Sequence, residues 1–525
     1  MGAFSKIVLV KKKKHFHTVT HNDNATATLL NPNSKTKVTT TTANPKTKRN
    51  PLKELLSCSC LFMDGKNHAL EQQQQQQPSI KFYALKKIDT SRVDIKYMDA
   101  LRNEIAIFKS LDHPNIIKAY ETFEYRRELS IIMELATGGD LYTRRPYKEP
   151  QSQRIVKQVV SAIAYMHHRN IMHRDLKFEN IMYENKKANA EIKVIDFGLS
   201  TKFLNPTHIM RDKVGTLTTV APEVIRGSYT VKADMWSIGV VAYMLLTGQD
   251  DLCPGTSKQD IERKILNFRW MEFYEKINHD DTLFVGISTE GKDFLQGLLE
   301  HHPSKRLSAD EALRHPWLTT AKSPTITSTT DKELTTTDVK PTTQSIRTAV
   351  QEYVHASELK KLALQLMAYQ SPHTEQMKKL RRAFSIFDVD QSGEITLDDF
   401  QTAFRQSNDE LSDKDIKQLF EQCDFKKEKC IDYTEFIAAT MESQGRIEES
   451  RIAEAFERLD PDNSGKISRE TICEILSHSE SDEYISSLLE EADFDGDGMV
   501  NYDDFRSLFV EKKKDDIRNI TCNSD

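Results

Sequence analysis

Long apolar runs are missing from this chain of 525 residues. Nothing approaches the roughly 18 consecutive apolar residues that a membrane-spanning helix needs, so the sequence predicts no transmembrane helix. The first apolar stretch, residues 7–10, is too short for the core of a secretory signal and precedes its lysines instead of following them. We therefore expect neither an integral membrane protein nor a secreted one.

Cysteine is also scarce, with seven residues at wide and irregular spacings. Neither a disulfide framework nor a zinc-binding spacing emerges from them. This usage is typical of a reducing, intracellular compartment. We expect a cytoplasmic protein, with partial membrane association or a nuclear location as alternatives.

Charge is unevenly distributed, although the whole chain has a formal net charge of only -6. Residues 1–53 contain 11 basic side chains against the single acid Asp23. Such a tail is either solvated and disordered or meets an anionic surface such as a membrane, and both interpretations stay open. Gly2 invites N-myristoylation, but the motif requires Ser or Thr where this chain has Lys6.

Composition and periodicity divide the chain into successive segments. We predict a disordered basic region at 1–78, an α/β domain at 79–318, a Thr-rich linker at 319–344, a junction helix at 345–370, a helical calcium-binding domain at 374–510 and a tail at 511–525.

Residues suited to phosphoryl transfer occur in a fixed order along the α/β segment. Lys86 ends the strand-like run 83–86 and is suited to gripping phosphates, and Glu104 follows on a helical segment where it can pair with Lys86. Asp175, in the run His-Arg-Asp-Leu-Lys, would orient a substrate hydroxyl. Asn180 and Asp196, the latter in Asp-Phe-Gly, would hold Mg²⁺.

Each fragment is weak alone, but the ordered set, closed by Ala-Pro-Glu at 221–223, resembles the eukaryotic protein kinase domain over about 80–318. The resemblance implies a serine/threonine kinase in which Lys177 contacts the transferring phosphate. It implies that Glu134 and Ala136 lie in the hinge that binds the adenine of ATP. It also suggests that Asp140 recognises a basic residue upstream of the target.

One element of the kinase pattern is absent. No G-x-G-x-x-G motif precedes Lys86, and the region ends in the glutamine run 72–77. Its loss removes backbone N–H groups that would hold the phosphates. Three explanations stay open: a kinase of reduced activity, a pseudokinase, or an incorrect gene model for the N-terminal part.

Acidic loops recur along the C-terminal part of the chain, beginning at Asp388, Asp424, Asp460 and Asp493, at spacings of 36, 36 and 33 residues. An EF-hand loop has 12 residues with oxygen ligands at positions 1, 3, 5, 7, 9 and 12 and glycine at position 6. The spacing therefore predicts four EF-hands with loops at 388–399, 424–435, 460–471 and 493–504.

The first and fourth loops match this pattern best. Their candidate Ca²⁺ ligands are Asp388, Asp390, Ser392, Glu394 and Asp399 in the first loop, and Asp493, Asp495, Asp497, Met499 and Asp504 in the fourth. Both end in Asp where Glu is expected. Because Asp is shorter and tends to bind with one oxygen, we expect lower calcium affinity and weaker discrimination against Mg²⁺.

The other two loops depart further. The third offers Asp460, Asp462, Ser464 and Lys466, but it ends in Thr471, so we expect weak binding or none. The second has Lys426 at position 3 and Lys429 in place of the glycine, and these ammonium groups repel a divalent cation. We expect the second loop to be a structural partner of the first. An array that binds no calcium at all is the alternative.

Kinase segment, junction and four EF-hands, in this order over about 80–510, resemble the calcium-dependent protein kinases of plants and protists. The resemblance implies a two-lobed α+β kinase fold followed by an all-α EF-hand domain, with ATP, Mg²⁺ and Ca²⁺ as cofactors. In that family the junction blocks the substrate cleft at rest, and calcium-loaded EF-hands capture it. Here 354–361 begin the basic, amphipathic segment that EF-hands would grip.

We expect a monomer that acts on Ser/Thr residues of proteins, with no nucleic-acid partner and with membrane contact through the basic tail as a hypothesis. The alternative function is a calcium-sensing scaffold on a weak or dead kinase domain, which the missing glycine loop would favour.

Overall fold

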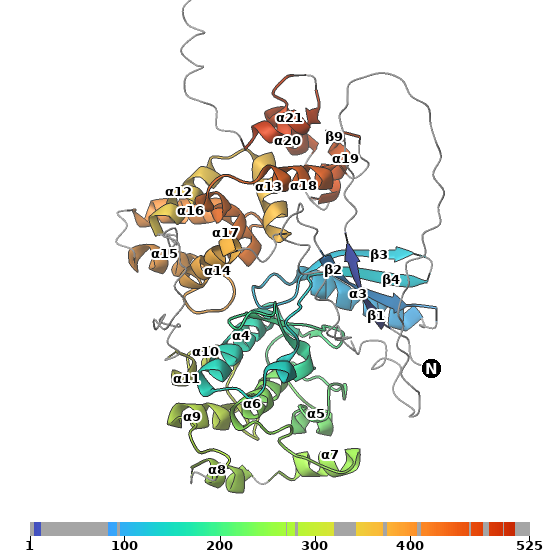
Figure 1. The fold of residues 1–525 in the computed structure, drawn as a ribbon, viewed down its shortest axis with the longest axis vertical. Coiled ribbons are helices and arrows are strands. Elements are labelled where there is room, and N and C mark those ends of the chain that lie inside the picture. Colours follow the sequence, from blue (N-terminus) through green and yellow to red (C-terminus); the bar gives the residue numbers. More distant parts are fainter. Residues whose placement is uncertain are drawn as a thin grey trace, which may run out of the picture.

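The computed structural model describes most of the chain from Phe82 onward, together with one N-terminal strand. The described residues are 5–11, 82–91, 95–125, 127–268, 270–278, 282–319, 343–370, 375–406, 411–460, 464–475, 482–496 and 498–509. Figure 1 shows a two-lobed α/β domain with a helical domain beside it. No helix of the described part combines the length and apolarity that a membrane span needs.

The smaller kinase lobe is a four-stranded antiparallel sheet in the order β1-β2-β4-β3, with one long helix against it. Its elements are β1 (Ser5–Lys11), β2 (Phe82–Asp89), α3 (Ile95–Ser110), β3 (Ala119–Tyr125) and β4 (Glu128–Met133). Strand β2 is buried at Ala84, Leu85, Lys86 and Ile88, the last at 1% exposure, and it pairs antiparallel with β4.

Strand β1 corrects one prediction. We expected residues 1–78 to lack regular structure, but Ser5–Lys11 pairs with β2, and Ile7 lies opposite Lys86. The β-branched residues Ile7, Val8 and Val10 favour a strand, which the low complexity of the surrounding tail concealed. The rest of that region lies outside the described residues.

The larger lobe is mainly helical (Figure 1). Its elements are η2 (Leu141–Arg144), α4 (Glu149–His168), β5 (Ile171–Met172), η3 (Phe178–Asn180), β6 (Ile181–Tyr183), β7 (Ile192–Val194), β8 (Thr201–Lys202), α5 (Pro222–Arg226), α6 (Lys232–Thr247), α7 (Lys258–Leu266), α8 (Trp270–Asn278), α9 (Thr289–Leu298), α10 (Ala309–Leu313) and α11 (Pro316–Thr319). Helix α6 is buried on almost every side, so its apolar residues form the centre of this lobe.

The junction forms two helices where the sequence predicted one. Helix α12 (Thr343–Val354) and helix α13 (Glu358–Tyr369) are separated by residues 355–357. The Ser357 hydroxyl accepts a hydrogen bond from the backbone N–H of Lys360 at 3.2 Å and so caps α13. A local capping preference therefore breaks a segment whose apolar periodicity continues across the break.

The EF-hand region consists of short amphipathic helices joined by the predicted loops. They are α14 (Glu375–Phe387), α15 (Leu397–Gln406), α16 (Asp413–Cys423), α17 (Tyr433–Thr440), η4 (Met441–Gln444), α18 (Glu449–Leu459), α19 (Arg469–Ile475), α20 (Asp482–Ala492) and α21 (Tyr502–Ser507), with strands β9 (Lys466–Ile467) and β10 (Val500–Asn501). Loops 1 and 2 are joined by mutual hydrogen bonds of Ile395 and Ile431, and loops 3 and 4 by β9 and β10. The hands therefore act as two pairs.

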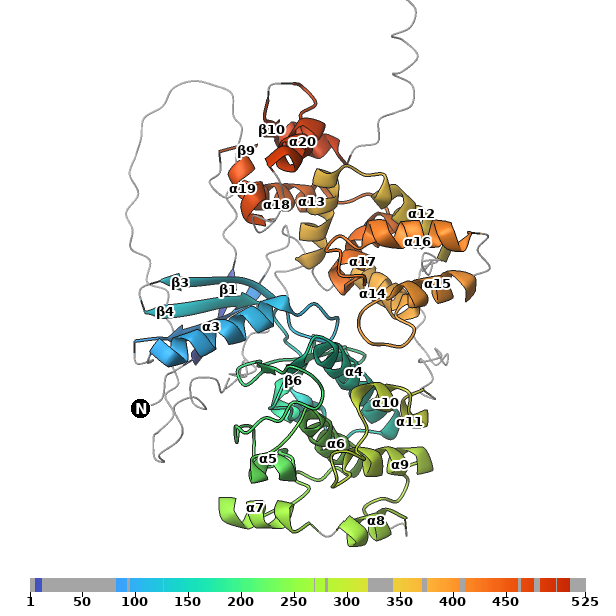
Figure 2. The same ribbon diagram turned by 180° about the vertical axis from the view of Figure 1, so that it is seen from behind.

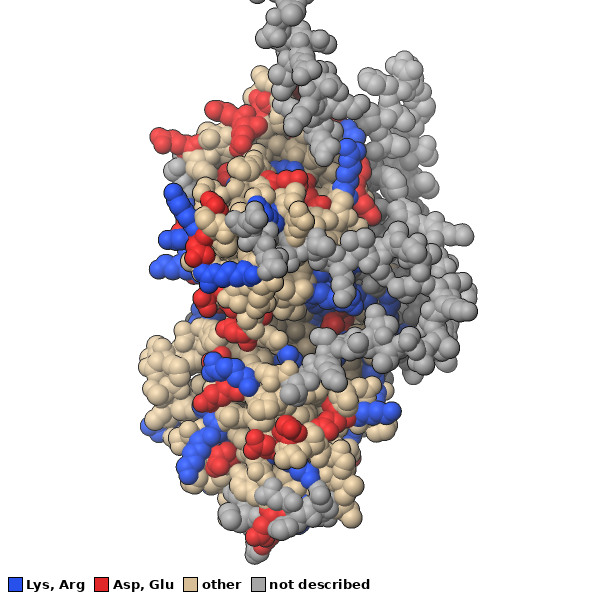
Figure 3. Space-filling model, turned by 90° about the vertical axis from the view of Figure 1, so that its left-hand side faces the viewer, with Lys and Arg blue, Asp and Glu red and all other residues tan. Residues whose placement is uncertain are grey.

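The junction and the EF-hands share one apolar core, separate from that of the kinase lobes. Leu359 and Leu364 of α13 are fully buried in the EF-hand core. In both ribbon views the loop between α14 and α15 lies against α4 (Figures 1 and 2). On the face drawn in Figure 3, the acidic and basic side chains of the described residues are interspersed.

Candidate active site and calcium-binding loops

The catalytic loop brings three of the predicted residues together: Asp175, Lys177 and Asn180. Lys177 Nζ lies 2.8 Å from Asp175 Oδ2, and Asn180 Nδ2 donates to the same oxygen at 3.2 Å. The other oxygen, Oδ1, accepts a hydrogen bond from the hydroxyl group of Thr216 at 2.6 Å. Asp175 is therefore an acceptor for a hydroxyl group with an ammonium group beside it.

Buried contacts hold this loop in place. Asp234, only 1% exposed, accepts hydrogen bonds at 2.9 Å from the backbone N–H groups of His173 and Arg174. Burial by itself would raise the pKa of Asp234, but His167 and the backbone N–H of His173 lower it. Because Arg174 has φ 68°, which non-glycine residues rarely adopt, the loop depends on such support.

The predicted nucleotide-binding lysine reaches the Asp-Phe-Gly aspartate. Lys86 Nζ lies 3.1 Å from Asp196 Oδ1, and both side chains are less than a tenth exposed. Glu104 on α3 lies close enough for its pKa to respond to Lys86. Burial raises the pKa of Glu104 to about 8, although Lys86 acts in the opposite direction. Among the described residues, Glu104 Oε2 has no hydrogen-bond partner, so this oxygen is not held by Lys86.

The hinge uses the side chain of Glu134 internally. Glu134 Oε1 lies 2.9 Å from Lys193 Nζ, and Oε2 accepts a hydrogen bond from the backbone N–H of Lys118 at 3.1 Å. Ala136 is half-buried against the kinase core. Binding of adenine at Glu134 and Ala136 would therefore rely on their backbone groups.

Two residues of the substrate side, Asp140 and Thr216, form internal hydrogen bonds. Asp140, expected to recognise a basic substrate residue, is 8% exposed, and its Oδ1 accepts a hydrogen bond from the backbone N–H of Tyr142 at 3.0 Å. It therefore caps η2 instead of facing solvent. Thr216 is hydrogen-bonded to both Asp175 and Lys177, the latter at 2.9 Å.

The first calcium loop is formed and has an unsatisfied buried oxygen. Asp388 is 4% exposed; its Oδ2 accepts the Gly393 N–H at 3.0 Å, while Oδ1 has no hydrogen-bond partner in the described structure. Burial raises the pKa of Asp388, and the carboxylates of Asp390 and Asp399 raise it further. Such a site is completed by a cation, so the residues fit Ca²⁺. Asp399 Oδ2 also accepts a hydrogen bond from Thr396 N at 3.0 Å.

The other candidates in this loop contribute less directly. Ser392 is 4% exposed, and its hydroxyl donates to the backbone oxygen of Glu394 at 3.1 Å. The Glu394 side chain turns away from the loop and binds Arg169 of the kinase domain. Its contribution to a cation site would therefore come from the backbone oxygen, as position 7 requires.

The fourth loop gathers its acids most closely. Carboxylate oxygens of Asp493, Asp495 and Asp504 lie within 4.8 Å of one another, a separation that one cation can bridge. Met499 is 45% exposed, as expected for a residue that offers only its backbone oxygen. The predicted ligand Asp497 lies outside the described residues.

The third loop is closed mainly by its own hydrogen bonds. Asp460 Oδ1 accepts a bond from the Ser464 N–H, and Oδ2 accepts one from the Gly465 N–H, both at 2.8 Å. The backbone oxygen of Lys466 accepts the Ser464 hydroxyl at 3.1 Å. Asp462 lies outside the described residues, so its predicted role stays a prediction.

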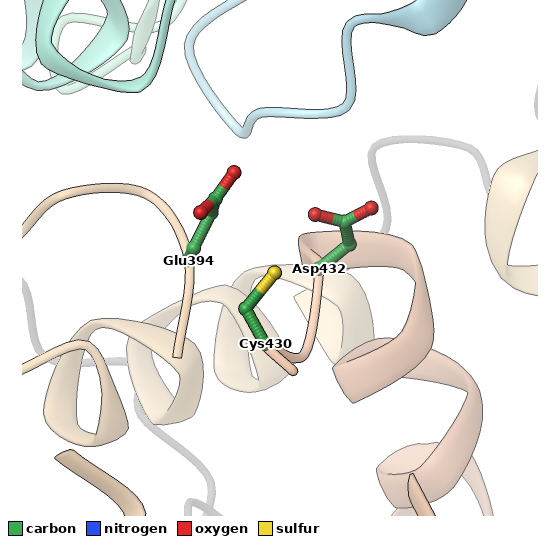
Figure 4. A group of neighbouring side chains, drawn as sticks. All are labelled: Glu394, Cys430 and Asp432. Carbon is green, nitrogen blue, oxygen red and sulfur yellow. The ribbon is translucent and has the colours of Figure 1, made fainter. Parts of the chain in front are cut away.

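One apparent metal site is filled by an arginine. Figure 4 shows Glu394, Cys430 and Asp432 directed into the same space between loops 1 and 2, and their ligand atoms lie within 4.8 Å of one another. Arg169 of α4 occupies that space: its Nε lies 2.7 Å from Glu394 and its Nη2 lies 2.7 Å from Asp432. This group is therefore an ion-paired contact between the two domains.

None of the contacts between the kinase domain and the EF-hands was predicted from the sequence. Thr434 donates from both its N–H and its hydroxyl to Asp112 at 2.8 Å, and Lys118 Nζ lies 3.0 Å from Asp112 Oδ1. Arg381 on α14 lies 2.9 Å from Glu184 of the kinase domain. Single charged residues in unrelated segments carry no periodic or motif signal, so nothing in the sequence marks them as partners.

Comparison with known proteins accords with this geometry. The protein kinase domain family matches residues 71–318, and the EF-hand domain pair matches residues 377–441 and 449–510. Calcium-dependent protein kinase 5 of Plasmodium falciparum is 31% identical over 448 residues, covering 84% of this chain and 74% of that protein. The chain belongs to the calcium-dependent protein kinase family. Calcium-dependent protein kinase 21 of Arabidopsis thaliana is 32% identical over 434 residues, covering 81% of this chain and 77% of its own length.

Calcium-dependent protein kinase 2 of Zea mays is likewise 32% identical over 434 residues, covering 81% of this chain and 80% of that protein. Membership of the calcium-dependent protein kinase family confirms the predicted fold, a two-lobed kinase domain followed by EF-hands. It confirms a calcium-regulated protein serine/threonine kinase that uses ATP, Mg²⁺ and Ca²⁺. No finding supports the scaffold alternative.

The junction adopts a different position from the one that the resemblance implied for the resting state. Helices α12 and α13 pack on the EF-hands, and the hydroxyl of Tyr369, at the end of α13, donates to the backbone oxygen of Ala119. In the described part of the chain, no bond connects the junction with Asp175, Lys177 or Thr216. Residues 343–370 of the junction therefore pack on the EF-hands and not on the catalytic loop.

Proposed function

We propose that Asp175 orients the hydroxyl group of a Ser or Thr side chain of a substrate protein for attack on the γ-phosphate of ATP. The observation that carries this proposal is the 2.6 Å hydrogen bond from the Thr216 hydroxyl to Asp175 Oδ1. It places a threonine hydroxyl of the chain itself at the atom that would receive a substrate hydroxyl. A carboxylate in this position supplies orientation and accepts the proton as the oxygen attacks.

The neighbouring residues would position the other reactant. Lys177 directs an ammonium group to the side of Asp175 where negative charge accumulates during transfer. Lys86 would hold the α- and β-phosphates, and Asn180 and Asp196 would hold Mg²⁺. Mg²⁺, when bound, neutralises charge on the phosphates. The 3.1 Å distance between Lys86 and Asp196 supports this proposal, because the phosphates and the metal ion would then be adjacent.

We also propose how calcium binding at loop 4 affects the junction. The first helix of the fourth hand, α20, contacts the start of α13: Tyr484 donates to Glu358 Oε2 at 3.2 Å, and the Glu358 N–H donates to Glu491 at 3.4 Å. Closing loop 4 around an ion moves its flanking helices relative to each other. The grip of the C-terminal pair on α13 would therefore respond to occupancy of Asp493, Asp495 and Asp504.

The assignment of Asp175 is tested by phosphate transfer from labelled ATP to a basic Ser/Thr peptide. Asp175→Asn should lower the rate by about 10²–10⁴-fold, the usual contribution of a positioned acid–base group. Asp250→Asn, which changes an exposed carboxylate of the same lobe, is the matched control. Retention of more than about a tenth of the rate by Asp175→Asn would reject the assignment.

We propose a cytoplasmic location in which the basic N-terminal tail gives reversible contact with anionic membranes. Lysines near a surface each add attraction to anionic lipid, an effect that salt screens. Sedimentation of the full chain with phosphatidylserine vesicles, compared with a variant carrying Gln at residues 11–14, tests the contact. Equal sedimentation of the two proteins would rule it out.

A further inference from the structure

The second EF-hand loop is closed although no ion is needed to satisfy its acids. Asp424, at position 1, accepts hydrogen bonds from the backbone N–H groups of Glu428 and Lys429 at 2.9 and 2.8 Å. Glu435, at position 12, accepts one at each oxygen, from the backbone N–H groups of positions 3 and 9 at 2.9 and 2.7 Å. Both carboxylates therefore have hydrogen-bond donors within the loop, as Asp493 and Asp504 of loop 4 also do, and what sets the second loop apart is the lysine at position 3.

A lysine supplies the positive charge of this loop. Lys426 Nζ is hydrogen-bonded to Oδ2 of Asp432 at position 9. The Asp432 side chain is only 1% exposed, whereas that of Lys426 is 44% exposed and reaches inward from the solvent side. A buried carboxylate without a partner is strongly unfavourable, so the ammonium group of Lys426 stabilises the closed loop.

The same carboxylate connects the loop with the kinase domain. Asp432 Oδ1 lies 2.7 Å from Nη2 of Arg169, so one buried aspartate bridges a cation of its own loop and a cation of α4. Two residues further, Thr434 binds Asp112, and Lys118 Nζ donates to the Thr434 hydroxyl at 2.8 Å. Loop closure thus presents both docking residues, Asp432 and Thr434, in the geometry that the kinase surface requires.

The docking site is bonded to the nucleotide hinge. The backbone oxygen of Lys118 accepts a hydrogen bond from the Glu134 N–H at 2.9 Å. The Lys118 N–H donates to Glu134 Oε2 at 3.1 Å. Lys118 Nζ also lies over the rings of Tyr369 and Tyr433, at 5.0 and 5.2 Å from their centroids. One lysine therefore touches the hinge, the end of the junction and the second hand.

We propose that Lys426 takes the place of calcium in the second EF-hand, and that this hand is a calcium-independent latch that keeps the N-terminal hand pair docked on the kinase domain. Calcium then acts through loops 1 and 4, while the latch persists in its absence. The inference rests on the proposed function only where it relates docking to control of the kinase. Docking itself can be measured without kinase activity.

Hydrogen–deuterium exchange of the full chain tests the latch. The peptides to follow cover residues 424–435 of the second loop and 112–118 and 161–169 of the kinase surface. In the wild type, their protection in calcium and in chelator should agree within about two-fold, because the bonds that hold them need no ion. Lys426→Gln should exchange at least about ten-fold faster in chelator at all three peptides, since it leaves Asp432 with one cation fewer.

Two variants serve as controls. Lys426→Arg keeps a cation and should keep the protection. Lys417→Gln removes an exposed lysine that pairs with exposed Glu421 and should change nothing at these peptides. If Lys426→Gln proves unfolded by circular dichroism, the wild-type comparison in calcium and chelator still decides the question.

Protection that appears in the wild type only with calcium would overturn the proposal, as would equal exchange of Lys426→Gln and Lys417→Gln. Phosphate transfer by the same samples separates the two claims. A protein that stays protected in chelator but transfers no phosphate under any condition refutes the proposed function and leaves the latch standing.

Discussion

Replacement of Arg169 by Gln would test whether ion pairs hold the two domains together. Arg169 lies 2.7 Å from Glu394, 2.7 Å from Asp432 and 3.1 Å from Glu428, whose side chains are 16%, 1% and 45% exposed. The pair with exposed Glu428 contributes little, at most about 1 kcal/mol. Breaking a fully buried pair costs about 3–5 kcal/mol because a buried charge is left behind.

Arg169 is itself 20% exposed, and Lys426 still compensates Asp432 in the variant, so the full buried value does not apply. We expect docking to weaken by about 2 kcal/mol, or roughly thirty-fold. Exchange of amide hydrogens in residues 388–399 and 424–435 reports the opening of the interface and should accelerate by that factor. Arg405→Gln, which removes an arginine paired with exposed Asp413, is the matched control.

The reasoning would be refuted if Arg169→Gln exchanged within about two-fold of both the wild type and Arg405→Gln. That outcome would assign the interface to the Asp112–Thr434 contact and to apolar packing. An effect confined to residues 388–399 would show that loop 1 and loop 2 dock independently.

Three further predictions concern the kinase site and the calcium loops. Burial raises the pKa of Glu104 from 4.5 to about 8, so between these values the folded protein keeps a proton that the unfolded chain has lost. The nucleotide-free protein should therefore lose up to about 1.4 kcal/mol of unfolding free energy per pH unit as pH rises through this interval, and Glu104→Gln should flatten the dependence in thermal melts. Arg306→Met leaves Glu223 buried without its bidentate partner and should lower unfolding free energy by about 3–5 kcal/mol in denaturant titrations, a prediction that a change below about 1 kcal/mol would contradict. Asp504→Glu should tighten calcium binding several-fold in calorimetry, because Glu reaches the ion with two oxygens; unchanged affinity would show that position 12 does not limit the fourth hand.

Local chemistry explains what could be predicted from the sequence. Asp175, Asn180 and Asp196 were found because phosphoryl transfer requires particular residue types in a fixed order, and the EF-hand loops because an oxygen-rich site of 12 residues has a rigid spacing. The side chains of Asp175, Lys177 and Asn180 indeed converge. Ser357 is of a residue type that favours a helix N-cap, but the apolar periodicity continues across it. The sequence therefore predicted one helix where the structure has two.

Contacts between distant segments could not be predicted in this way. Asp112 and Thr434 are more than 300 positions apart, and neither belongs to a motif that names a partner. Asp140 fits a substrate-recognition pattern, yet its carboxylate caps a neighbouring turn, a use that only the backbone geometry reveals. Strand β1 pairs with β2 across a long low-complexity stretch, so no local turn signal connects the two.

The most direct test of a calcium-switched kinase is the initial rate of phosphate transfer by the full chain at fixed ATP and Mg²⁺, in calcium and in chelator. We predict that calcium raises the rate and that Asp388→Asn combined with Asp493→Asn removes the increase while folding and docking persist. A rate that is equal in calcium and chelator, or an increase that survives in the double variant, would contradict control of the active site through loops 1 and 4.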